Sequence, residues 1–292
     1  MNRPVIIGYD GSEGAGTAVE WGAAYAARHG APAHVVRAFE PHMYDVGLAG
    51  GYVAGDVEAL RAAARDQLER LAAEAVERHP GLMVTTSLER GVAQEVLVRE
   101  SLRARALILG SRGTSSFSTL LAGSTTMHAA THAHCTVIAV PGEMAVPVGG
   151  QVVVGVDGSE LSEAAVAFAF QEAGETGAPL IAVHAWLDPA VTSALGSVLA
   201  PLDDPVRHSE GQDVLLAESL AGWSEKYPDV ALTRRVVHSH PVTALVDSAA
   251  GARMLVVGSR GHGAVRSLLL GSVSHGLLHL ARCPVAVVRH HN

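Results

Sequence analysis

The sequence predicts two consecutive α/β domains, each built on five parallel strands with helices on both faces. Two observations lead to this fold class. First, the chain of 292 residues contains an internal repeat, because the run Val5–Glu13 reappears as Val152–Glu160. Second, short β-rich runs alternate with helical patterns in both halves, which is typical of parallel sheets with right-handed crossovers. We therefore expect a doubly wound strand arrangement that occurs twice.

The two halves are joined by a short segment rich in proline and glycine. Residues 141–150 contain Pro141, Pro147, Gly149 and Gly150. This composition is typical of a connection between folded parts. The predicted domains are residues 1–144 and 149–292, and each has the ordinary length of a single domain.

Apolar and β-branched runs predict the strands of the first half near residues 4–9, 33–39, 82–88, 105–110 and 135–140. The patterns between them predict helices near residues 13–29, 57–79, 92–103 and 123–133. In the second half, strands are expected near residues 151–157, 179–186, 230–237, 253–258 and 284–289. Residues 42–56 and 188–205 fit no element, and we expect loops there, either ligand lids or ordinary surface loops.

Composition excludes several classes of protein. A hydrophobic content of 48% with 17% charged residues is typical of a compact globular protein. The formal charge of −8 argues against a nucleic-acid partner, which usually meets a basic face. No signal-peptide pattern and no apolar run near the ~20 residues of a membrane span is found, and two cysteines form no disulfide framework. We expect a cytoplasmic protein.

A glycine-rich loop follows the fourth predicted strand of each half. It reads Gly110-x2-Gly113-x9-Gly123-Ser124 in the first half and Gly258-x2-Gly261-x9-Gly271-Ser272 in the second. Glycine lets a ligand approach the backbone closely. The helix that follows presents unpaired N–H groups and the positive end of its dipole. Such a place favours an anion, most simply a phosphate.

Asp10 and Asp157 each follow the first strand of a half. One interpretation is an acceptor for ribose hydroxyls, as acidic residues are in other doubly wound nucleotide sites. The other is turn and helix-cap chemistry of the Asp-Gly-Ser-Glu run. Because the aspartate and the glycine loop recur together at matched spacing in both halves, we favour the interpretation in which the aspartate binds a ligand. Parallel strands end at one edge of their sheet, so both features are expected to line one crevice.

The Gly-x2-Gly-x9-Gly-Ser spacing resembles the nucleotide-binding loop of the universal stress protein family, in its ATP-binding form with two tandem domains. The resemblance covers nearly the whole chain. It implies a Rossmann-like fold of the adenine nucleotide alpha hydrolase type, and two bound ATP molecules per chain, with Mg²⁺ as a further candidate. It also implies a regulatory role in stress or growth arrest with little or no hydrolysis, a homodimer, and a regulatory protein partner.

The resemblance assigns binding roles by position. The residues beside adenine and ribose are Gly8, Tyr9, Asp10 and the backbone of Ala38 in the first half, and Gly155, Val156, Asp157 and the backbone of Ala185 in the second. The phosphate-binding set is Gly110, Arg112, Gly113, Gly123, Ser124, Thr125 and Thr126, repeated as Gly258, Arg260, Gly261, Gly271, Ser272, Val273 and Ser274. Since Val273 lacks the hydroxyl of Thr125, we expect the second site to be the weaker.

Catalysis is not expected from the motifs present. The chain lacks a G-x-x-x-x-G-K-[ST] loop and the protein-kinase signature set. Arg112 and Arg260 could supply positive charge, but no candidate base accompanies them. Histidine pairs at helical spacing, such as His128 and His132, lack a third ligand, so no metal site is expected. The alternatives are a slow ATP hydrolase or transferase, and a scaffold that binds another adenine nucleotide, such as a cyclic one.

Overall fold

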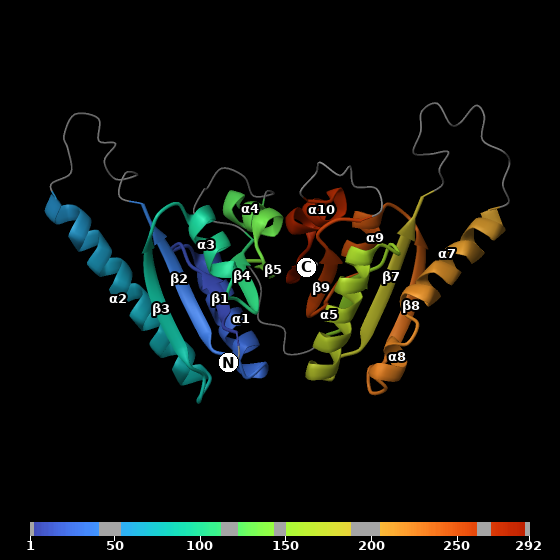
Figure 1. Cartoon of the computed structure of the whole chain (residues 1–292), viewed down its shortest axis with the longest axis horizontal. Coiled ribbons are helices and arrows are strands. Elements are labelled where there is room, and N and C mark those ends of the chain that lie inside the picture. Colours follow the sequence, from blue (N-terminus) through green and yellow to red (C-terminus); the bar gives the residue numbers. More distant parts are fainter. Residues whose placement is uncertain are drawn as a thin grey trace, which may run out of the picture. The chain divides into compact units, whose positions relative to one another are not determined.

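The computed structural model describes residues 3–40, 54–111, 122–142, 150–187, 205–261 and 270–289. The chain divides into two compact units, Met1–Val146 and Pro147–His290. Each unit contains five parallel strands covered by helices, which confirms the predicted fold class (Figure 1). Within the described ranges, no helix combines the length and the apolar character needed to cross a membrane.

The first unit follows the expected alternation of strands and helices. Its elements are β1 (Val5–Gly8), α1 (Glu13–Arg28), β2 (Ala33–Phe39), α2 (Ala54–Arg78), β3 (Val84–Arg90), α3 (Ala93–Ser101), β4 (Ala106–Gly110), α4 (Ser124–His132) and β5 (Thr136–Val140). The strand order is β3-β2-β1-β4-β5, and every pairing is parallel. Helices α1 and α2 pack on one face, and α3 and α4 pack on the other. The connections that follow β1 and β4 therefore leave toward opposite faces of the sheet.

The second unit repeats this plan. Its elements are β6 (Val152–Gly155), α5 (Glu160–Thr176), β7 (Leu180–Trp186), α7 (Pro205–Ser219), α8 (Trp223–Lys226), β8 (Leu232–His238), α9 (Pro241–Ser248), β9 (Met254–Gly258), α10 (Ser272–Leu280) and β10 (Val285–Val288). The strand order is β10-β9-β6-β7-β8, again with parallel pairings. The described connection between α2 and β3, residues 79–83, contains no counterpart of the short helix α8.

Several element boundaries differ from the prediction. Strand β3 begins at Val84 rather than at residue 82, because Leu82 N–H still closes the turn after α2 by donating to the His79 carbonyl at 3.0 Å. Helix α2 begins at Ala54 and α7 at Pro205, so the ends of both predicted loops are helical. The first turn of a helix adds few buried apolar residues, so periodicity does not detect it. Residues 42–53 and 188–204 lie outside the described residues.

Helix α1 lies very close to the central strands because glycine occupies the contact point. Gly22 is buried, and a methyl group at its Cα would lie 2.7 Å from Cδ1 and 2.9 Å from Cγ1 of Ile7. Ile7 and Ile108, on β1 and β4, are fully buried beneath it. Gly16 lies on the same helix, but a methyl group there would meet nothing within 4 Å. Gly22 and Gly16 therefore have different structural roles in α1.

We expect Gly22→Ala and Gly16→Ala to change stability in opposite directions. The first substitution forces Ile7 or the helix to shift and should lower the free energy of unfolding by about 1–3 kcal/mol. The second improves helix propensity without a clash and should raise it by roughly 0.5–1 kcal/mol. Denaturant unfolding of the full chain, followed by circular dichroism, measures both. Equal effects of the two variants would contradict this close helix–sheet contact.

Candidate functional site

The candidate site of each unit lies where its first and fourth strands end side by side. In the first unit, β1 pairs with β4 in the register Ile7↔Ile108. The same edge therefore carries Asp10, just beyond β1, and Gly110, at the end of β4. In the second unit the corresponding register is Val154↔Val256. The aspartate and the first glycine of the loop therefore lie at the same edge, as expected from the sequence, and the crevice stays a prediction.

The loop after β1 combines an aspartate turn with a helix cap. Asp10 Oδ1 accepts the Ser12 N–H at 2.9 Å, and Ser12 Oγ accepts the Ala15 N–H at 3.1 Å, which caps α1. Gly11 between them has φ +91°, a conformation that favours glycine. The turn-and-cap interpretation is therefore correct for one carboxylate oxygen. Asp10 is nevertheless exposed, and the described part of the chain offers no hydrogen bond to its Oδ2.

The matching aspartate of the second unit is bound more extensively. Asp157 Oδ1 accepts the Ser159 N–H at 3.1 Å and the Ser159 hydroxyl at 2.7 Å. Asp157 N–H donates to Ser162 Oγ at 3.1 Å. These three bonds fix both the backbone and one oxygen of Asp157. The carboxylate therefore holds a defined position at the edge of the sheet.

Asp157 and the glycine loop of the second unit are in direct contact. Oδ2 of Asp157 lies so close to Gly261 that a methyl group at that Cα would overlap the carboxylate. Gly271 lies against the backbone of Arg260, since a methyl group on it would be 3.2 Å from Arg260 Cα. The absence of a side chain lets the backbone approach its neighbours closely at both positions. The structure thus brings together the aspartate and the glycine loop, which the sequence places at the same edge of the sheet.

Each glycine loop is tied to the strand before it by a buried hydroxyl. Thr126 Oγ1 donates to the Gly110 carbonyl at 2.8 Å, and Ser274 Oγ donates to the Gly258 carbonyl at 2.6 Å. Both residues are 3% exposed. In this structure their hydroxyls therefore stabilise the loop from inside. Their predicted role in phosphate binding is not tested by this geometry.

A second link closes each loop before the next helix begins. Gly123 N–H donates to the Ser111 carbonyl at 2.7 Å, and Gly271 N–H donates to the Ser259 carbonyl at 2.8 Å. Gly123 and Gly271 are the N-cap residues of α4 and α10, and neither has a side chain that could cap the helix. Among the described residues, no side chain caps the first N–H groups of either helix, so these groups can meet an external acceptor. An anion at this place would also meet the positive end of the helix dipole.

The remaining predicted residues fall into distinct environments. Gly8 and Gly155 face leucine and valine side chains of the core, where a methyl group would clash or be crowded. The side chain of Ala38 packs on the hydrophobic cluster beneath α3, and Ala185 is half-buried in β7. The exposed or half-exposed members on the first turns of α4 and α10 are Ser124, Thr125, Ser272 and Val273. Arg112 and Gly113 lie outside the described residues, whereas Arg260 is exposed.

In the first unit, the structure adds a polar network that the sequence analysis missed. Arg37 Nη1 donates to Gln67 Oε1 at 2.7 Å, and Gln67 Nε2 donates to the Tyr9 hydroxyl at 2.6 Å. The guanidinium also lies beside Gly11 and 5.8 Å from the centre of the Tyr9 ring. Helix α2 therefore supports the loop after β1. The available signal was a charged residue, Arg37, inside a strand whose other residues are apolar apart from His34.

The second unit uses a different set of residues at the same place. His184 on β7 bonds through Nδ1 to the Val156 carbonyl at 2.7 Å and through Nε2 to Gln212 Oε1 at 2.8 Å. His184 occupies the strand position of Arg37, and Val156 that of Tyr9. The two candidate sites therefore share their backbone and differ in the side chains behind it. Across the described ranges, no group of three or more His, Cys, Asp or Glu residues is arranged to hold a metal ion.

Comparisons with known proteins identify the family and the fold of the chain. A model of the universal stress protein family matches residues 1–141 and 150–289. The chain is 38% identical to universal stress protein Rv2005c of Mycobacterium tuberculosis over 99% of both chains. It is 33% identical to a universal stress protein of Mycolicibacterium smegmatis over 98% of this chain and 96% of that relative. A solved universal stress protein from Archaeoglobus fulgidus shares the fold, with a TM-score of 0.68 and 18% identity over 99% of each chain.

The buried link between Thr126 and Gly110 gives a test that is independent of any ligand. Thr126→Val keeps the shape but leaves the Gly110 carbonyl without its donor, so it should lower the free energy of unfolding by about 1–3 kcal/mol. Hydrogen exchange of the loop amides should become faster. Thr125→Val is the matched control, because the second unit carries Val273 at that position. If Thr125→Val were as destabilising as Thr126→Val, the hydroxyl–carbonyl link would not be what holds the loop.

Proposed function

Because the chain belongs to the universal stress protein family, we propose that it binds one ATP in each unit and acts as a regulator. Nucleotide occupancy changes its conformation or its choice of protein partner during stress or growth arrest. A ligand produces such a change when it binds one conformation better than another. The proposal includes a cytoplasmic homodimer that binds ATP with little or no hydrolysis, with Mg²⁺ as a candidate companion of the phosphates.

The observation that carries this proposal is the contact between Asp157 and Gly261 at the carboxyl edge of the second sheet. Carboxylate oxygens at this place in doubly wound folds accept ribose hydroxyls. The glycine loop leads to Gly271 and the uncapped start of α10, which suits phosphate oxygens. One ligand that carries ribose and phosphate satisfies both features. Adenine would then lie toward Ala185 on β7.

The first unit offers the same groups around Asp10, Gly110 and Gly123. Thr125 adds a hydroxyl in the first turn of α4 where the second unit has Val273. We therefore propose that both units bind ATP and that the first binds it more tightly. A difference of one hydrogen bond to a charged phosphate corresponds to roughly tenfold or more in affinity.

The deciding experiment is to denature freshly purified protein and to identify the nucleotide that it releases. Close to two ATP per chain would support two sites and a binding role. ADP together with phosphate would favour the slow hydrolase. A cyclic or other adenine nucleotide would favour the scaffold that binds a different ligand. Protein that is empty and does not bind added ATP would overturn the proposal.

Substitution of the two aspartates separates the sites. Asp10→Ala and Asp157→Ala should each remove one ATP site from a calorimetric titration, weakening that site by roughly 10- to 100-fold because a charged hydrogen bond to ribose is lost. The other site should keep its affinity. Asp247→Ala, an exposed aspartate of α9 away from the sheet edge, is the control. Unchanged titrations for both site variants would contradict the assignment of ribose to these carboxylates.

A further inference from the structure

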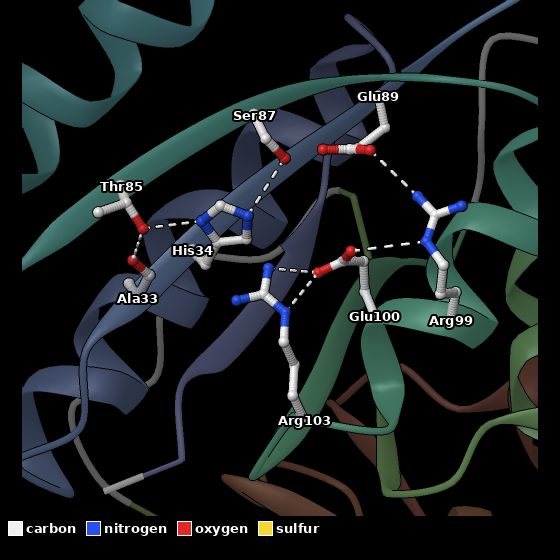
Figure 2. Close-up of polar contacts among 8 residues, drawn as sticks. All are labelled: Ala33, His34, Thr85, Ser87, Glu89, Arg99, Glu100 and Arg103. Carbon is white, nitrogen blue, oxygen red and sulfur yellow. Dashed lines mark hydrogen bonds and ion pairs between the residues drawn. The ribbon is translucent and has the colours of Figure 1, made fainter. Parts of the chain in front are cut away.

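Three side chains on β2 and β3 form a hydrogen-bonded row away from the candidate nucleotide sites (Figure 2). His34 is paired in register with Thr85 on the neighbouring parallel strand. Ser87, two residues further along β3, lies on the same face of the sheet. The imidazole bonds through Nδ1 to Thr85 Oγ1 at 2.7 Å and through Nε2 to Ser87 Oγ at 3.1 Å. The imidazole therefore lies between two hydroxyls.

Thr85 Oγ1 lies within reach of two partners, His34 Nδ1 at 2.7 Å and the Ala33 carbonyl at 3.4 Å. When the hydroxyl donates to the carbonyl, it accepts from His34 Nδ1. In this tautomer, which our proposal uses, Nδ1 carries the proton of the imidazole. The lone pair of Nε2 then faces Ser87, whose hydroxyl donates to it. This is the arrangement of a nucleophile, a base and a residue that orients the base.

The surroundings keep this imidazole neutral. Burial lowers the pKa of His34 below 6.5, and the positive charge of Arg103 lowers it further, while Glu100 and Glu89 act in the opposite direction. His34 is 9% exposed. A neutral imidazole at physiological pH is the form that accepts a proton from a serine.

A rim of paired charges lies beside the row (Figure 2). Arg103 Nε donates to Glu100 Oε2 at 2.8 Å. Arg99 contacts Glu89 at 3.1 Å and Glu100 at 3.9 Å. The two guanidinium groups offset the two carboxylates, so the rim does not repel an anion. Arg103 is close enough to His34 to lower the pKa of its imidazole.

The serine is accessible from the edge of the first sheet. Strand β3 is the last strand in the order β3-β2-β1-β4-β5 of this unit. Ser87 is half-buried, and Thr85 beside it is exposed. A small molecule can therefore approach Ser87 from this edge, and α3 lies over the inner part of the same face.

We propose that Ser87 is a nucleophile, activated by His34, that takes an acyl group from a small activated carboxylic ester. Ser87 Oγ attacks the carbonyl carbon while its proton moves to Nε2 of His34. The bond from that carbon to the ester oxygen then breaks, and the alcohol leaves with the proton from Nε2. The product is an acyl-serine, which water hydrolyses with His34 again as the base. Thr85 is a positioning residue, and because it is neutral the reaction is expected to be slow.

The second unit serves as an internal comparison. In β7 and β8, the residues at the positions of His34 and Ser87 are Ile181 and Arg235, and only Thr233 corresponds to Thr85. The base and the nucleophile are therefore both absent from these positions there. The proposed reactivity belongs to the first unit alone and does not depend on nucleotide binding.

The test uses the full chain with two reagents, an alkyl fluorophosphonate and p-nitrophenyl acetate. The fluorophosphonate reacts when Ser87 Oγ forms a bond to phosphorus and fluoride leaves, so mass spectrometry of peptides locates the label. We expect one labelled site at Ser87 and release of p-nitrophenol from the ester. Ser87→Ala should abolish both reactions. His34→Gln should slow labelling on the order of 100-fold, and Thr85→Val should slow it less.

The control variant is Thr86→Val, which removes a hydroxyl from the same strand on the opposite face and should leave the rate unchanged. Circular dichroism and thermal unfolding of each variant exclude loss of the fold. The labelling rate should rise with pH through the pKa of His34, below 6.5, and should be level above it. Label at other serines only, an unchanged rate in His34→Gln, or a rate that rises steadily into alkaline pH would overturn the proposal. None of these results would affect the ATP titrations.

Discussion

The parallel pairing of the first strand of each unit with both of its neighbours is the constraint on which the rest of the structure depends. Strand β1 lies between β2 and β4, and β6 lies between β7 and β9. Because all of these strands run the same way, their carboxyl ends meet at one edge. The helices that follow leave to opposite faces, so the backbone opens there. The aspartate turn and the glycine loop lie together because these strands are parallel.

Short internal hydrogen bonds then give this edge its shape. Hydroxyls of Thr126 and Ser274 hold the first residue of each glycine loop, and Ser12 and Ser159 cap the helices after the aspartate turns. These polar groups satisfy the backbone from inside, which leaves the uncapped N-termini of α4 and α10 as the sites where an external acceptor can bind. Some residues of the motif therefore support the loop from inside, and others face outward, where a ligand can bind.

Duplication kept the backbone and allowed the side chains behind it to diverge. Behind the first aspartate turn, Arg37 and Gln67 hold Tyr9, whereas His184 and Gln212 hold the backbone of Val156 in the second unit. The hydroxyl–imidazole row around His34 has no equivalent in the second unit, because that strand position is Ile181. Strand pairing fixes backbone geometry, so each unit can change its side chains without losing the sheet.

The sequence by itself determined the duplicated domain, the strand–helix alternation and the residues expected at the site, because a repeat and hydrophobic periodicity are local properties. It misplaced the start of β3 and of α2, where a turn and a first helical turn carry little apolar pattern. Only the tertiary structure decided that Asp157 contacts Gly261, that Arg37 reaches Gln67, and that His34 lies between Thr85 and Ser87. These residues are distant along the chain, and their contacts depend on strand register and helix packing, which local patterns do not encode.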